Sequence, residues 1–117
     1  PKDFEGQRFI SLAPGDSYRQ AIDQMFALAQ VKRQTSLETA SAVAVCAMVR
    51  QGLGVAIVNP LTAWELSGPE LLVRPLSVDL PFKVSLLLPE VAAPHPLREA
   101  LVQAMLMAAK GYQNARL

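Results

Sequence analysis

The chain has 117 residues, enough for one hydrophobic core and too few for two complete domains. Its 11 lysines and arginines nearly balance 10 acidic residues, and Lys32-Arg33 is the densest basic pair, so we expect no DNA binding by this chain itself. Hydrophobic residues make up 51%, yet the apolar stretches are shorter than the roughly 18–20 residues that cross a membrane. A single cysteine, Cys46, and no signal-like sequence at the opening Pro1-Lys2-Asp3 favour a cytoplasmic protein.

The first half of the chain alternates predicted strands with predicted helices. We expect strands at 8–12, 35–38 and 55–58, and helices at 18–29, 41–51 and 61–66. Ser17 with Gln20 fits a capping box, Gly52 closes the second helix, and the β-branched run at 55–58 is typical of a central strand buried on both faces. This order predicts an α/β fold with a parallel sheet and right-handed crossovers.

The second half has a different pattern. A fourth strand is expected at 71–76, at an edge of the sheet or leaving it, because Pro75 cannot donate to a ladder. After a connector at 77–81 we expect a strand at 83–88, a proline-rich turn and a last amphipathic helix ended by Gly111. The turn contains Pro89, Pro94 and Pro96.

No catalytic or metal-binding set stands out, so we predict a protein that is not an enzyme and needs no cofactor. His95 lies beside two prolines and is better explained as a turn or cap residue. Cys46 lies on an apolar helix face, far from His95 along the chain. Gly52-Leu53-Gly54 follows a helix and precedes a strand, the reverse of a phosphate-binding loop.

Small polar residues stand where strands give way to helices. Thr39 and Ser41 precede the uncharged helix, and Asn59 precedes Pro60 at the next one. Parallel α/β sheets bind ligands beyond the carboxyl ends of their strands, and a helix start suits a carboxylate. Capping alone also explains all three residues. Asp16 is a weaker candidate for an ammonium contact and is better explained as a turn residue.

Several blocks of the sequence resemble the effector-binding region of LysR-type bacterial transcription regulators. The blocks are Asp3-Phe4-Glu5-Gly6, Ile10-Ser11-Leu12, Asp16-Ser17-Tyr18-Arg19-Gln20, Val31-Lys32-Arg33, Glu38-Thr39, Val45-Cys46-Ala47-Met48-Val49-Arg50 and Val58-Asn59-Pro60-Leu61-Thr62-Ala63. The likeness runs from about Asp3 to Leu88 and fades in the last helix and tail.

The resemblance implies a two-lobed sensor like a periplasmic binding protein, preceded by a winged helix-turn-helix. Residues 1–81 match the second lobe with its hinge strand, called subdomain II. Residues 82–117 match the closing strand and helix of subdomain I. The rest of that lobe and the DNA-binding domain lie outside this chain, so promoter DNA is expected to be bound by the absent N-terminal domain.

The resemblance also implies an amino-acid effector. The 16–20 and 45–50 blocks favour the members that control the diaminopimelate decarboxylase gene of lysine biosynthesis, with diaminopimelate or lysine as effector. Regulators of opine catabolism remain an alternative because they share the 38–39 pair and the 59–60 region. A periplasmic amino-acid-binding lobe, from another class of protein, is a further alternative, and a secretory signal upstream would distinguish it.

The family's habit of binding its effector in this loop assigns the main carboxylate contact to Thr39, Ala40 and Ser41. Ser11 and Asn59, after the flanking strands, are expected to lie close enough to help. The resemblance implies homodimers or tetramers, and the short apolar stretches predict no association with membranes. The strand at 83–88 and one stripe of the last helix are expected to pack on the absent lobe and to drive self-association without it. The stripe contains Leu97, Leu101, Ala104, Met105 and Ala108.

Overall fold

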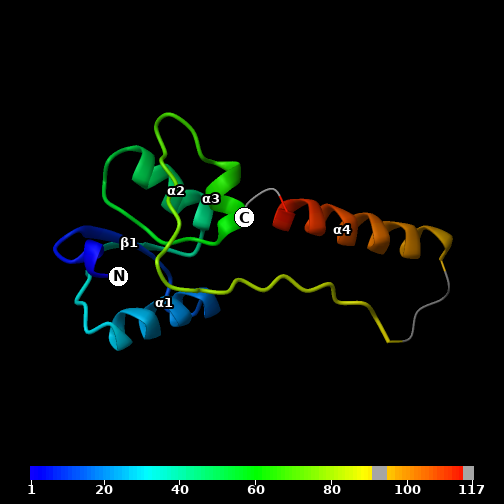
Figure 1. The fold of residues 1–117 in the computed structure, drawn as a ribbon, viewed down its shortest axis with the longest axis horizontal. Helices are drawn as coiled ribbons and strands as arrows, with labels where there is room; N and C mark the ends of the chain where they lie inside the picture. The colour runs from blue at the N-terminus through cyan, green and yellow to red at the C-terminus, as the bar shows by residue number, and fades with distance from the viewer. Residues whose placement is uncertain (91–94, 115–117) are drawn as a thin grey trace. The chain divides into compact units, whose positions relative to one another are not determined.

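A computed structural model describes residues 1–90 and 95–114, the last three by their backbone alone. The chain divides into two compact units, Pro1–Val84 and Ser85–Leu117 (Figure 1). The first unit contains a short 3-10 helix, η1 (Lys2–Phe4), and an α/β arrangement of strands and helices. The second unit contains α4 (Pro96–Asn114).

Two parallel strands form the sheet of the first unit. Strand β1 spans Arg8–Leu12 and β2 spans Gln34–Thr39, and α1 (Ser17–Leu28) connects them. The register pairs Ser11 with Glu38 and Leu12 with Thr39, after an irregularity between Phe9 and Ile10. The predicted parallel pairing of these strands is confirmed.

The predicted third strand is reduced to one bridge. The Ile10 N–H donates to the Val55 carbonyl and the Val55 N–H to the Arg8 carbonyl, both at 2.9 Å. The rest of the run at 55–58 forms no strand, so its prediction as a central strand is wrong. Strand β1 is central instead, because it pairs with β2 on one edge and with Val55 on the other.

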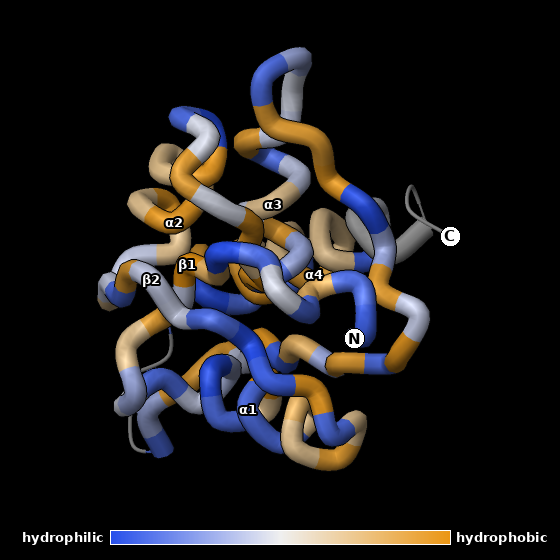
Figure 2. Tube along the Cα trace, turned by 90° about the vertical axis from the view of Figure 1, so that its left-hand side faces the viewer, coloured by the Kyte–Doolittle hydropathy of each residue, from blue (hydrophilic) through white to orange (hydrophobic). Residues whose placement is uncertain are grey.

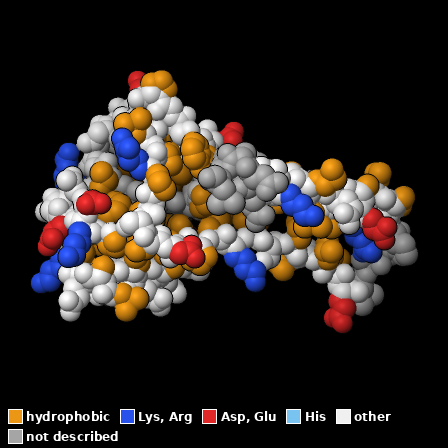
Figure 3. All heavy atoms as spheres, viewed as in Figure 1, with side chains coloured by type: hydrophobic (Ala, Val, Ile, Leu, Met, Phe, Trp, Pro, Cys, Tyr) orange, Lys and Arg blue, Asp and Glu red, His pale blue; other side chains and the backbone are white. Residues whose placement is uncertain are grey.

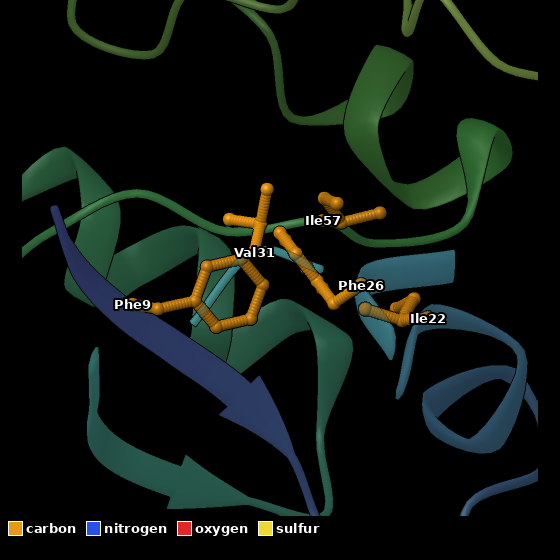
Figure 4. Close-up of a cluster of buried hydrophobic side chains, with 5 residues drawn as sticks. All are labelled: Phe9, Ile22, Phe26, Val31 and Ile57. Atoms are coloured by element: carbon orange, nitrogen blue, oxygen red, sulfur yellow. The ribbon is translucent and has the colours of Figure 1, made fainter. Parts of the chain in front are cut away.

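Helices cover the two faces of β1, which lies between α1 and α2 (Ala42–Arg50) in Figures 1 and 2. Side chains alternate along a strand, and the core divides accordingly. Phe9 packs with Ile22 and Phe26 of α1 (Figure 4). Ile10 and Leu12 pack with Val45 of α2. All of these apolar side chains are buried, so β1 carries both halves of the core.

Helix α1 begins at a different cap from the predicted one. The side chain of Asp16 accepts hydrogen bonds from the N–H groups of Tyr18 and Arg19, at 2.8 and 3.0 Å. The capping box of Ser17 and Gln20 is therefore wrong, because the carboxylate one residue earlier already satisfies these amides.

The ends of the next two helices follow the prediction. Ser41 caps α2, and Gly52 follows it with φ of 72°. The Gly52 and Leu53 N–H groups donate to the Val49 and Met48 carbonyls, the pattern of a Schellman motif. The following helix, α3 (Pro60–Glu65), begins at the cap residue Asn59, as predicted.

Neither predicted strand of the second half forms. Residues 71–76 contribute one antiparallel bridge, in which Leu71 pairs with Gly68 across a tight turn. Residues 83–88 run extended and exposed, and they have no ladder partner among residues 1–90 and 95–114. Both segments have strand-like composition, but a strand also needs a neighbour to pair with.

The predicted last helix is confirmed as α4, but it ends later than predicted. It continues through Gly111 to Asn114, because a glycine inside a helix costs only about 1 kcal/mol relative to alanine and ends it only as part of a cap. The Nδ1 atom of His95 accepts from the Leu97 N–H at 3.3 Å, so His95 is a cap residue, as expected. Pro94, assigned to the preceding turn, lies outside the described residues.

Gly54 allows the close approach of Val55 to β1. A Cβ atom at this position would overlap the Arg8 carbonyl oxygen and lie 3.0 Å from its carbon. We predict that Gly54→Ala lowers the free energy of unfolding by about 1–3 kcal/mol, as overpacking typically does. Gly15→Ala is the control, because a Cβ atom at Gly15 would have nothing within 4 Å. Equal urea midpoints for the two variants would contradict this account.

Candidate functional site

The loop from β2 to α2 holds three of the predicted site residues together. Thr39 ends β2 half-buried, and Ala40 and Ser41 follow it exposed. The Thr39 hydroxyl oxygen accepts from the Ser41 N–H at 3.4 Å, and the Ser41 hydroxyl oxygen accepts from the Ala44 N–H at 3.3 Å. Both hydroxyls have thus used an acceptor position and keep their protons for donation.

The first turn of α2 adds backbone donors to this loop. The Ala44 N–H is bonded to the Ser41 side chain and the Val45 N–H to the Ser41 carbonyl. The amides of Ala42 and Val43 have no hydrogen-bond partner in the part of the chain that is described. Helix starts with free N–H groups and the positive end of the helix dipole suit an anion.

Asn59 lies at the corresponding position beyond Val55. Its side-chain oxygen accepts from the Thr62 N–H at 2.9 Å, which leaves its amide protons for donation. The Val55 bridge is parallel to β1, so Asn59 and Thr39 follow segments that run in the same direction. The Arg50 side chain also donates to the Leu66 carbonyl at 2.9 Å and joins the ends of α2 and α3.

Ser11 differs from the other candidates because it lies inside β1 and not after it. It is 1% exposed, and its hydroxyl has no hydrogen-bond partner among the described residues. By strand alternation its side chain lies on the α1 face with Phe9, whereas Leu12, the register partner of Thr39, lies on the α2 face. No hydrogen bond joins the Ser11 hydroxyl to the start of α2 among the described residues, and its part in the site stays a prediction.

Asp16, the weaker candidate, is occupied by its own helix. One carboxylate oxygen accepts both the Tyr18 and the Arg19 N–H groups. This is the turn role that the sequence favoured for it.

Four charged side chains connect α1 to β2, and the sequence pattern did not mark them as site residues. We call Arg19, Asp23, Arg33 and Glu38 the α1–β2 ion cluster. Nε of Arg19 donates to both carboxylate oxygens of Asp23 at 2.8 and 2.9 Å, and its Nη1 reaches Glu38 Oε1 at 2.8 Å. Arg33 pairs with the same Asp23. The i, i+4 spacing of Arg19 and Asp23 was the available sequence signal.

The side chain of Arg33 is as little exposed as that of Arg19, but its guanidinium lies over two aromatic rings of the core. Its guanidinium lies 5.1 and 5.2 Å from the ring centroids of Phe9 and Phe26, and its Nη1 is buried without a partner among the described residues. Burial lowers the pKa of Arg33, and the nearby positive charge of Arg19 lowers it further. Stacking on two aromatic faces partly compensates for the lost hydration.

The remaining candidates of the first unit are Cys46 and a cavity beside α2. Burial raises the pKa of the Cys46 thiol, which disfavours the thiolate that a nucleophile needs. No cluster of metal-ligating side chains occurs in residues 1–90 and 95–114. A cavity of about 390 Å³ lies among α2, residues 56–58 and residues 71–77, but none of the five predicted site residues lines it.

Comparison with known proteins identifies related chains. The model of the LysR substrate binding domain matches residues 1–110. The chain is similar to the transcriptional activator protein LysR of Escherichia coli strain K12, with 51% identity over 104 residues, 89% of this chain and 32% of that protein. The regulatory protein NocR of Agrobacterium tumefaciens strain T37 is 30% identical over 107 residues, 88% of this chain and 36% of its own length. This chain thus spans about a third of these relatives. No solved structure matches it.

The buried hydroxyl of Ser11, which has no partner among the described residues, predicts an effect on stability. A buried polar group without a partner destabilises the folded state, by about 1–3 kcal/mol. We expect Ser11→Ala to raise the free energy of unfolding by about 1 kcal/mol, part of that penalty. Ser41→Ala is the contrasting variant and is expected to lower it by about 0.5–2 kcal/mol through loss of the cap. Urea unfolding of both variants checks this, and a clear loss of stability in Ser11→Ala would contradict it.

Proposed function

The chain belongs to the LysR substrate binding domain family, and we propose that it senses an amino-acid effector through the β2–α2 loop of a bacterial transcription regulator. Family membership supports a small-molecule effector, because the matched family model is a substrate-binding domain. The hydrogen bonds of the loop support the position of the site.

The main support for this position of the site is that its polar groups have hydrogen-bond donors free. Thr39 and Ser41 accept from backbone amides and retain hydroxyl protons, and Asn59 retains its amide protons. The N–H groups of Ala42 and Val43 add to them. Donors at a helix start favour a carboxylate over an ammonium group. We therefore assign the effector carboxylate to residues 39–41, with Ala40 contributing backbone.

Diaminopimelate or lysine is the effector that we propose. One support is the 51% identity to the transcriptional activator protein LysR of Escherichia coli. The other is the resemblance of the 16–20 and 45–50 blocks to family members that control the diaminopimelate decarboxylase gene. An opine is the alternative, supported by the resemblance of the 38–39 pair and the 59–60 region to regulators of opine catabolism. All three are amino acids and carry the carboxylate that the loop fits.

The parent protein is proposed to be a longer, cytoplasmic regulator. Residues 1–81 form its second lobe, and residues 82–117 supply a strand and helix to its first lobe. Promoter DNA is bound through an N-terminal domain outside this chain, and homodimers or tetramers hold that DNA. An effector can shift such a regulator only by binding one of its states more tightly. For the described residues, no helix is long and apolar enough to cross a membrane.

The effector site is tested by two substitutions that preserve folding. Asn and Asp both cap helices as well as Ser, so Ser41→Asn and Ser41→Asp keep the start of α2. Ser41→Asp adds a negative charge against the proposed carboxylate. We expect Ser41→Asp to bind diaminopimelate at least about tenfold more weakly than Ser41→Asn, and Thr39→Ala about tenfold more weakly than the parent.

Calorimetry on the full-length regulator, with diaminopimelate and lysine as titrants, measures these affinities. Ser17→Ala is the matched control, because Ser17 also lies at a helix start but Asp16 supplies the cap. Equal affinities for Ser41→Asp and Ser41→Asn, in variants with equal melting temperatures, would exclude a carboxylate at this loop.

Exposed apolar side chains support the assignment of 82–117 to another lobe. Leu97, Leu101 and Met105 of α4 are 68%, 61% and 46% exposed, and Leu87 is 93% exposed. Figure 3 shows apolar side chains at the surface over α4. Contiguous apolar patches of several hundred Å² mark interaction sites or aggregation-prone surfaces.

We predict that the 117-residue chain alone self-associates at micromolar concentration. Its exposed apolar side chains then pack against another copy in place of the missing lobe. Analytical ultracentrifugation should show species larger than a monomer, and a chain truncated after Pro81 should show fewer of them. A strictly monomeric 117-residue chain would contradict this proposal.

A further inference from the structure

We propose that Arg19 is a positioning residue for effector binding, a role that rests on the function proposed above. Arg19 holds the end of β2 so that Thr39 and Ser41 present their donors in a fixed place. It acts through Glu38 and the backbone and does not touch the effector.

Strand β2 needs such a contact because apolar packing does not hold it. Its residues from Gln34 to Glu38 are exposed, and Thr39 is half-buried. Leu37, the large hydrophobic residue of the strand, is 40% exposed. The strand is therefore held by its ladder to β1, by the Ser36 hydroxyl, which donates to the Phe9 carbonyl at 3.3 Å, and by polar contacts at its two ends.

Arg19 ties together the ends of both strands. Its Nη1 donates to the Leu12 carbonyl at 2.6 Å and to Glu38 Oε1 at 2.8 Å. Leu12 ends β1, and Glu38 directly precedes Thr39. Just after β1, the Ala13 N–H donates to the Thr39 carbonyl at 2.9 Å. Besides the ladder to β1, the backbone that leads into the effector loop is thus fixed by the Arg19 side chain and by this main-chain bond.

Asp23 fixes Arg19 in turn. Its carboxylate accepts Nε of Arg19 within α1 and also pairs with Arg33, which directly precedes β2. The side chains of Arg19 and Arg33 are each 11% exposed. One carboxylate on α1 therefore anchors the arginines at the beginning and at the end of β2.

Arg33 offers a matched control for a merely structural role. It shares Asp23 and the same exposure with Arg19, but it stacks on Phe9 and Phe26 in the core. We expect Arg19→Gln and Arg33→Gln each to lower the free energy of unfolding. A loss of effector affinity is expected from Arg19→Gln alone, because Arg19 bonds to the strand ends beside the loop.

The first measurement is the affinity of the full-length regulator for diaminopimelate, by calorimetry well below the melting temperature of each variant. We expect Arg19→Gln to weaken binding about tenfold and Arg33→Gln to change it less than about twofold. Arg19→Lys should restore part of the affinity, because an ammonium group can reach Glu38 but lacks the planar fork. Equal losses in Arg19→Gln and Arg33→Gln, or no loss in Arg19→Gln, overturn the proposal.

The Thr39→Ala variant separates this proposal from the function on which it rests. If Thr39→Ala weakens binding and Arg19→Gln does not, the effector site stands and the positioning role fails. If neither variant weakens binding, the effector site itself fails, and the positioning role fails with it.

Amide hydrogen exchange tests the positioning without any ligand. The Ser41 and Ala44 amides, bonded to Thr39 and Ser41, should exchange faster in Arg19→Gln than in Arg33→Gln. The Ile10 amide, bonded to Val55 in the centre of the sheet, is the internal reference. Unchanged protection of Ser41 and Ala44 relative to Ile10 in Arg19→Gln contradicts the proposal.

Discussion

The pairing of β1 with a parallel neighbour on each edge is the constraint on which the first unit depends. Its backbone bonds to β2 and to Val55, while its alternating side chains bury Phe9 against α1 and Ile10 against α2. Because its neighbours are parallel, the connections that follow them leave in the same direction. The loop after β2 and the cap at Asn59 follow segments that run in the same direction because both segments pair with this one strand.

Strand β2 is held in place without a core of its own. The ladder to β1 sets its register, and the α1–β2 ion cluster holds its ends. Asp23 and Glu38 are 43% and 42% exposed in their side chains, so salt weakens these ion pairs more than it weakens apolar packing. The order of the proposed effector loop is therefore sensitive to electrostatics, whereas the stability of the unit depends mainly on its buried side chains.

Local sequence signals predicted the elements that local interactions decide. The bounds of β1 follow from an apolar run and a Pro-Gly turn, and Ser41 and Asn59 cap their helices as their residue types indicate. Long-range pairing was not predictable in the same way. The segments 71–76 and 83–88 have the composition of strands, but no neighbour pairs with them in a ladder among the described residues. For the same reason the central position of β1, between β2 and Val55, was not visible in the sequence.

The candidate site shows the same limit for chemistry. Residue types located the helix starts, but they could not show which polar atoms were already occupied. Asp16 has its carboxylate taken by two amides, whereas Thr39 and Ser41 use acceptors and keep donors. Capping and ligand binding are thus compatible at residues 39–41. A cap uses the lone pairs of the hydroxyl oxygen, whereas a bound carboxylate accepts the hydroxyl proton. The internal bonds of the loop therefore leave the hydroxyl protons of Thr39 and Ser41 for the carboxylate that we propose.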